Sequence, residues 1–311
     1  MNYTTYSGNW ITCGSYALIH AANLHNVDLI SLENSTGASF GINCAGEDYC
    51  GMRMLSVFRD FNYGIDAAAP LWGIRLKRFD GITKKFIADL LQNYSIKRVV
   101  IGPINMTSLT YLPLSQQYRC ADHFIACIRY NESLWKLIDS EGIPGMLMDS
   151  EQIIKILTIQ NIPEACEKYT IRVVLDVNEP IAIQNKIIRI RYTLKTAYRN
   201  LKDAQESGQG FRAIQRYAEL IQSIPPEKYR SFLYDIDYLI QRKIMLLKLL
   251  QEAEREKVAI VNTNIITVIC QFIEIAGTLR GNFQKQLFDS LAEAEKDITE
   301  EWKEWVNYDS N

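Results

Sequence analysis

The stretch NWITCGSYALIHAANLHN, residues 9–26, places a cysteine directly before a short apolar segment. Ala17, Leu18, Ala21 and Leu24 recur at helical spacing, which predicts a helix over residues 13–25 that packs on a core. The N-terminus of a helix is positive and favours the thiolate form of a cysteine placed there. Two interpretations of Cys13 stay open on this evidence: a nucleophile, or a small apolar side chain in a first turn.

Length and composition indicate an ordinary globular protein of about two domains. The chain has 311 residues, with 48% hydrophobic and 23% charged residues and a formal net charge of −2. This balance gives no sign of a nucleic-acid or anionic-membrane partner. With no secretory leader pattern and no apolar run of about eighteen residues, we expect a cytoplasmic protein without a membrane span. The 7 cysteines and 3 histidines are scattered, so no metal site is expected.

The pattern changes character near residue 180. Before it, β-branched runs predict strands at 98–106, 123–130, 134–140 and 169–177, and helices over 13–25, 82–94 and 150–158, the last with Ser150 as N-cap. After it, apolar residues recur at helical spacing to the end of the chain. The sequence therefore predicts an α+β domain over 1–180 and an all-helical bundle domain over 181–311.

A histidine and an aspartate are expected to lie together on the predicted strands. His123 opens one strand and Asp139 closes the next, with the three-residue loop NES between them. Such a loop pairs Tyr130 with Leu134 and sets His123 opposite Glu141, so that His123 and Asp139 become diagonal neighbours on one face. In that position an aspartate can accept the imidazole N–H and orient the ring.

These residues carry a resemblance to a known family. The segments CGSYALIHAAN, VVIGPINMTSLTYLP and DHFIACIRYNESLWKLIDSEGIPGMLMDSEQI resemble the butirosin biosynthesis protein H family, which is similar to C39 peptidases and has a papain-like cysteine fold. The resemblance covers roughly residues 5–155. It implies that Cys13 is the nucleophile, His123 the base and Asp139 the residue that orients the base. It also implies transfer of an acyl group from a carrier-protein thioester to an amine.

The expected oxyanion hole departs from the papain-like pattern. Enzymes of that fold usually carry a glutamine six residues before the cysteine, where this chain has Ser7. The nearest upstream amide is Asn9. We therefore expect the Asn9 side chain and the Cys13 backbone N–H as the oxyanion donors.

A basic face is predicted on the first helix after residue 180. Arg191, Lys195, Arg199 and Lys202 follow one another at steps of four, four and three residues. This stripe is either a solvated helix face or a docking surface for an acidic acyl or peptidyl carrier protein. The substrate would then be held on the phosphopantetheine of that carrier, with no cofactor bound to the chain itself.

Three classes of function fit this sequence. The first is a cysteine acyltransferase of natural-product biosynthesis, in which a carrier-bound thioester acylates Cys13 and an amine takes the acyl group. The second is a C39-like cysteine peptidase, thioesterase or amide hydrolase, in which water resolves the same intermediate. The third is a non-catalytic binding module on the same fold. Cys44, in a glycine-rich segment, is a competing reactive thiol.

Overall fold

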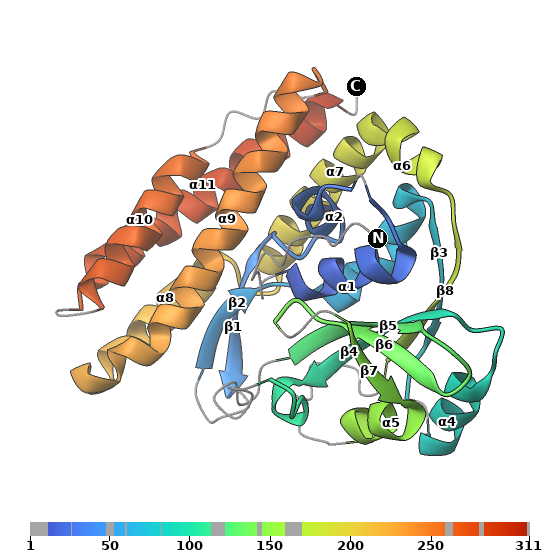
Figure 1. The fold of residues 1–311 in the computed structure, drawn as a ribbon. Coiled ribbons are helices and arrows are strands. Elements are labelled where there is room, and N and C mark those ends of the chain that lie inside the picture. The colour runs from blue at the N-terminus through green and yellow to red at the C-terminus, as the bar shows by residue number, and fades with distance from the viewer. Residues whose placement is uncertain are drawn as a thin grey trace. The chain divides into compact units, whose positions relative to one another are not determined.

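The protein is an α+β molecule whose described residues form two compact units (Figure 1). The computed structural model describes residues 12–25, 27–47, 53–59, 61–81, 83–112, 122–141, 145–158, 170–258, 264–279 and 283–309. We call the first unit the sheet unit: its described residues lie up to 32 and within 65–185. The second, the helical unit, takes its described residues from 33–64 and from 186 onward.

An antiparallel sheet of six strands forms the centre of the sheet unit. Its spatial order is β3-β8-β4-β5-β6-β7, and every neighbouring pair is antiparallel. The strands are β3 (Ile74–Phe79), β4 (Arg98–Asn105), β5 (Asp122–Arg129), β6 (Leu134–Ile138), β7 (Met146–Asp149) and β8 (Ile171–Val177). β4 and β5 therefore lie in the middle of the sheet, where both faces can be covered.

Helices cover both faces of this sheet. α1 (Cys13–Ala22) lies across β4, β5 and β8 on one face, and α4 (Lys84–Gln92) and α5 (Ser150–Thr158) lie on the other (Figure 1). The core between the sheet and α4 and α5 includes Ile101, Ile125 and Trp135. The unit also contains η2 (Ala69–Trp72), η3 (Met106–Ser108) and α6 (Glu179–Gln184). α2 (Leu29–Ser35) and α3 (Phe61–Ala68) span two of the three points where the chain passes between units, and the third lies between residues 185 and 186.

The strands predicted over 98–106, 123–130, 134–140 and 169–177 are confirmed within a few residues. The predicted hairpin register is confirmed as well, since Ala126 pairs with Ile138 and the Tyr130 N–H donates to the Leu134 carbonyl at 2.9 Å. The predicted cap of α5 is wrong. Asp149, not Ser150, caps this helix, because its carboxylate accepts the Gln152 N–H at 2.8 Å while the Gln152 side chain accepts the Asp149 N–H at 3.0 Å.

A bulge in β4 lies directly beside His123. Ile101 pairs with Ile125 and Ile104 with His123, so β4 holds one more residue than β5 between these pairs. Gly102, in the bulge, has φ 151°. A Cβ at Gly102 would lie 2.4 Å from the Phe124 ring and 2.7 Å from the His123 carbonyl oxygen. Only glycine therefore lets β4 approach β5 this closely at the histidine.

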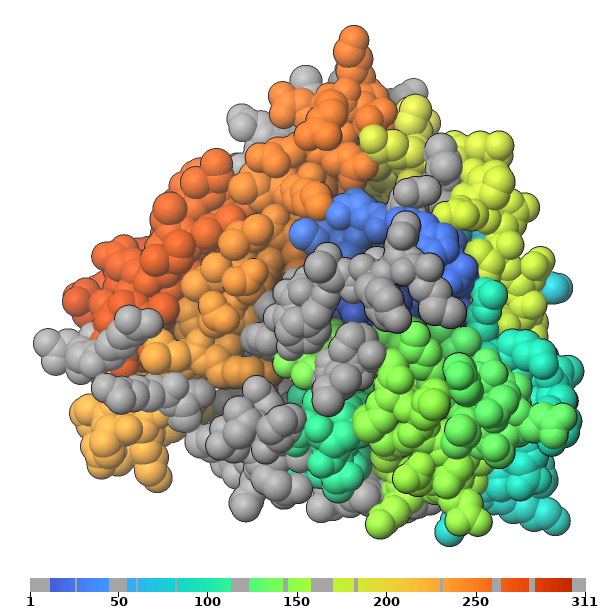
Figure 2. Space-filling view, viewed as in Figure 1, coloured from blue at the N-terminus to red at the C-terminus, as the bar shows by residue number. Residues whose placement is uncertain are grey.

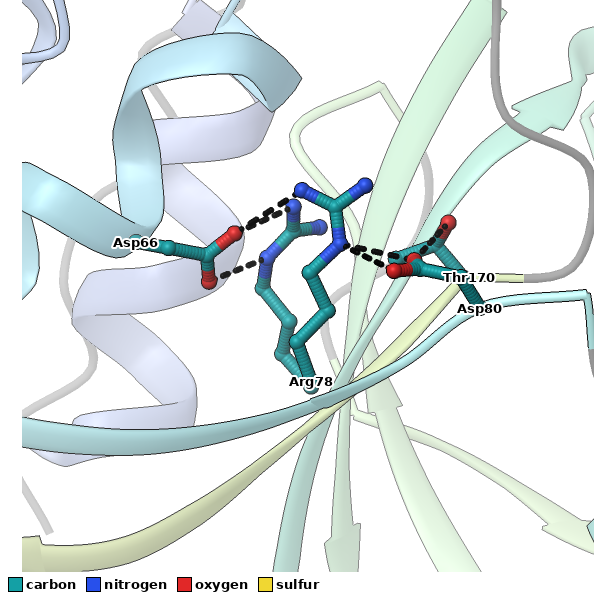
Figure 3. Close-up of polar contacts among 5 residues, drawn as sticks. Asp66, Arg78, Asp80 and Thr170 are labelled. Carbon is teal, nitrogen blue, oxygen red and sulfur yellow. Dashed lines mark hydrogen bonds and ion pairs between the residues drawn. The ribbon is translucent and has the colours of Figure 1, made fainter.

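A charged cluster joins α3 to β3 and β8 (Figure 3). The Asp66 carboxylate accepts two hydrogen bonds from Arg172, at 3.0 Å each, and one from Arg78 at 3.0 Å. Arg78 also binds Asp80, whose carboxylate accepts the Thr170 hydroxyl. Burial would raise the pKa of Asp66, but the bonds and charges of Arg172 and Arg78 hold it below its usual value. Since the two cations meet two carboxylates, we interpret the cluster as structural.

The helical unit combines a small hairpin with long helices. β1 (Ile42–Glu47) pairs antiparallel with β2 (Arg53–Val57). Its helices are α7 (Lys186–Glu206), α8 (Phe211–Gln222), α9 (Leu233–Arg255), α10 (Ile265–Thr278) and α11 (Lys285–Asp309), with η5 (Pro226–Phe232) before α9. α9 and α10 contact each other, and both reach the surface seen in Figure 2. Beyond residue 185 no strand occurs in the part of the chain that the structure describes, as predicted.

The observed units do not follow the predicted single boundary at residue 180, because each unit is made of separate stretches of the chain. Described residues within 33–64 group with the helices that follow residue 185, because apolar side chains of Phe40, Ile42, Leu55 and Val57 enter the same core as those helices. Glu33 also pairs with Arg242 of α9 at 2.5 Å, both side chains being buried. None of the described helices has the length and apolar character needed to cross a membrane.

Replacing Gly102 by alanine should destabilise the sheet unit strongly. The new Cβ meets backbone and ring atoms that cannot withdraw, and we expect a loss of about 2–3 kcal/mol in the free energy of unfolding, measured by urea denaturation. Gly81→Ala is the matched control, since Gly81 has φ 58° but nothing within 4 Å of an added Cβ. The control should lose only about 1 kcal/mol. Equal losses for the two variants would show that the contact at the bulge does not matter.

Candidate functional site

Cys13 is the first residue of α1, as the sequence predicted. No acidic residue lies in the first turn, so the positive end of the helix dipole is not offset there. The helix ends at Asn23, which adopts the left-handed conformation (φ 56°, ψ 42°) and donates its N–H back to the His20 carbonyl. Most of α1 is buried, while Cys13 itself is half-buried. The thiol thus lies at the accessible end of a buried helix.

His123 and Asp139 are in direct contact. The His123 Nε2 atom lies 2.7 Å from Asp139 Oδ1, and both side chains are only 1–2% exposed. Burial would raise the pKa of Asp139, but the His123 charge and the hydrogen bonds from His123, Tyr111 and the Glu141 N–H hold it below its usual value. Asp139 is therefore ionised at neutral pH, and His123 donates the Nε2 proton to it.

His123 also interacts with Cys13. Burial alone would lower the pKa of His123, but its interactions with Asp139 and Cys13, which include a hydrogen bond from the ring to each side chain, together hold it well above its ordinary value. Because Nε2 is bonded to Asp139, Nδ1 is the ring nitrogen left for the thiol. The structure thus brings the three sequence-predicted residues into one chain of contacts, from thiol to imidazole to carboxylate.

Tyr111 completes the surroundings of Asp139. Its hydroxyl donates to Asp139 Oδ2 at 2.5 Å, while Oδ1 accepts the Glu141 N–H at 2.7 Å in addition to His123. Burial and the nearby Asp139 charge raise the pKa of Tyr111, so its hydroxyl keeps the proton that it donates. No role for Tyr111 was predicted from the sequence. Its place in the segment LTYLP, which the family resemblance includes, was the available signal.

Of the two predicted oxyanion donors, the Cys13 backbone N–H lies within the described residues. As the first residue of α1, Cys13 has a backbone N–H without an acceptor inside the helix, which is the position that an oxyanion donor of this kind occupies. Asn9, the other predicted donor, lies outside the described residues.

The other three described cysteines are either buried or located on a separate helix. Cys44 is buried in strand β1, not in a loop, which argues against it as a competing nucleophile. Cys127 is fully buried, and burial together with the Asp139 charge raises the pKa of its thiol. Cys270 is exposed on α10. Within the described residues, no group of three or more histidine, cysteine, aspartate and glutamate side chains could hold a metal ion.

The basic stripe lies on the outer side of α7. Arg191, Lys195, Arg199 and Lys202 are all exposed, whereas Leu194 and neighbouring apolar residues of the same helix are buried. Lys202 forms an ion pair with Glu206 at 3.6 Å. The predicted exposed basic face is thus present.

Neither a scan against protein-family models nor a search of the curated proteins found a match to this chain. Any functional assignment therefore depends on the side chains of the site.

The charge state of His123 can be followed by NMR, because the chain has only 3 histidines. We expect the His123 ring to lose its proton well above pH 6.5 and His20, whose pKa burial and the charge of Lys136 lower, to lose it below pH 6.5. Asp139→Asn removes the main group that favours the imidazolium, so the pKa of His123 should fall by about 1–3 pH units. A His123 ring that titrates below pH 6.5 in the wild-type protein would contradict an ion pair between His123 and Asp139.

Proposed function

We propose that the protein is a cysteine acyltransferase that accepts an acyl group from a carrier-protein thioester and passes it to an amine. The observation that supports this most is the buried His123 ring, which contacts Asp139 through Nε2 and interacts with Cys13 at a helix N-terminus. An oriented base beside a cysteine is the arrangement required of an activated thiol nucleophile.

We further propose that the sheet unit has a papain-like, C39-like fold and that the chain is related to the butirosin biosynthesis protein H family. Support comes from a cysteine at the start of a buried helix, a histidine on a central strand and an aspartate after the next strand. The resemblance of the motifs around Cys13, Tyr111 and His123 agrees with this proposal. We place the protein in the cytoplasm.

The proposed reaction has two halves. The Cys13 thiolate attacks the thioester carbonyl carbon, the bond from that carbon to the phosphopantetheine sulfur breaks, and His123 gives its proton to the departing sulfur. An amine nitrogen then attacks the acyl carbon and loses a proton to neutral His123, while the Cys13 sulfur leaves as a thiolate. This restores the Cys13 thiolate and the protonated His123 ring with which the reaction began. Asp139 stays ionised throughout and holds the ring in one orientation.

Incubation with N-acetylcysteamine thioesters should add one acyl group, located at Cys13 by mass spectrometry. Cys13→Ala should abolish this acylation, and His123→Ala should slow it by about 100-fold or more. Asp139→Asn should leave more activity than either, because it removes only the group that orients the base.

The matched control is Cys270→Ala, which removes an exposed thiol from α10 and should leave acylation unchanged. Acylation of Cys270 in preference to Cys13 would contradict the assignment. Acyl release by water at the same rate with and without an amine would favour the hydrolase alternative.

We also propose that the carrier protein docks on the basic stripe of α7. An acidic carrier surface would be complementary to the four cations of this stripe, all of which are exposed. Exposed charge pairs contribute only about 0–1 kcal/mol each, so the effect should lie mainly in the rate of association.

Reversing Arg191, Lys195 and Arg199 to glutamate should raise the apparent KM for a carrier-bound donor. Turnover of a small N-acetylcysteamine thioester should stay nearly unchanged, because this donor needs no docking surface. Added salt should weaken the wild-type carrier reaction, since surface charges are screened within about 8 Å at physiological ionic strength. Equal slowing of both donors would show that the stripe is structural.

A further inference from the structure

Glu141 lies beside the site that contains Cys13, His123 and Asp139. Its backbone N–H donates to Asp139 Oδ1 at 2.7 Å, which fixes the chain at this point relative to the carboxylate. Continuing the β5–β6 register past its last pair, Ala126 with Ile138, brings Glu141 opposite His123. The Glu141 side chain interacts electrostatically with both His123 and Asp139, as this register requires.

The Glu141 carboxylate is only partly satisfied. Its Oε1 atom is buried and has no hydrogen-bond partner in the described part of the chain, while the residue as a whole is half-buried. A buried carboxylate oxygen without a donor is unfavourable, and a bound cationic N–H group would satisfy it.

The charges around Glu141 favour a cation. Two carboxylates, Asp139 and Glu141, act on each other and on the single imidazole of His123, so negative charge is in excess around Glu141 even while this ring is protonated. Once an acyl group covers the Cys13 sulfur and His123 has lost its proton, Glu141 has no positive neighbour among the residues that act on it. This is the state of the site in which an acceptor must bind.

We propose that Glu141 binds the acceptor as a protonated aliphatic amine and removes its first proton. The inference rests on the proposed acyl transfer and specifies the chemical class of its acceptor. The ammonium gives one proton to the Glu141 carboxylate and becomes nucleophilic. Its nitrogen attacks the acyl carbon, a second proton passes to His123, the bond to the Cys13 sulfur breaks, and Glu141 later releases its proton to solvent.

Burial raises the pKa of Glu141, which makes this carboxylate a better proton acceptor than an exposed one. The arrangement selects against alcohols and aromatic amines, because these groups are uncharged at neutral pH and gain nothing from a carboxylate of this kind. Amine donors that carry a positive charge are therefore the expected acceptors.

The test compares two nucleophiles on the full-length acyl-enzyme. N-acetylcysteamine thioester loads Cys13, and release of the small thiol reports the acylation rate. Deacylation is then followed with n-butylamine, a cation at pH 7, and with hydroxylamine, which is uncharged at that pH. Glu141→Gln should acylate like the wild type and use hydroxylamine equally well, but lose at least about tenfold in kcat/KM for n-butylamine.

Glu132→Gln is the matched control, because Glu132 is exposed in the hairpin loop and should affect neither nucleophile. Unchanged use of n-butylamine by Glu141→Gln overturns the inference. Equal loss with both nucleophiles, or slower acylation, also overturns it, because Glu141 would then act on His123 or Asp139 and not on the acceptor. A wild-type protein that forms no acyl-enzyme overturns the proposed function itself, and the inference with it.

Discussion

The site depends on a single buried negative charge. Placing the Asp139 carboxylate in the interior costs several kcal/mol unless donors surround it. Three donors do so, from His123 on β5, from Tyr111 after η3 and from the backbone of Glu141. The three donors come from different segments of the chain. Satisfying this one charge therefore fixes the positions of the three segments relative to one another. The position of the imidazole ring follows from that requirement.

Orientation of the ring also determines which atom faces the thiol. With Nε2 bonded to Asp139, proton exchange with Cys13 is restricted to Nδ1. The ring therefore needs no reorientation between its protonated and neutral states, and the charge that would move in the proposed acyl transfer would meet groups that are already in place. The glycine bulge in β4 contributes to this rigidity, because it lets the two central strands pack tightly where the histidine stands.

Features governed by local sequence could be predicted, and features that depend on distant contacts could not. The start of α1 and the β5–β6 register follow from neighbouring residues, since a short loop allows few strand pairings. The short strand β7 and the bond from Tyr111 to Asp139 depend on packing across the sheet, which periodicity does not reveal. The grouping of residues within 33–64 with helices far along the chain was missed for the same reason. The cap of α5 was assigned to the wrong neighbour because serine and aspartate carry similar capping signals.

The interleaved path of the chain has a consequence for how the protein folds during synthesis. The Leu55 N–H donates to the Asp235 carboxylate, 180 residues later, and the Asn34 side chain donates to the Met245 carbonyl, 211 residues later. At roughly 5–20 residues per second, the ribosome needs about 10–40 s to produce the second partner of each pair. During that interval the apolar side chains of β1 and β2 have no core to enter. Nascent chains are thus open to premature aggregation, and slower translation lengthens the exposure.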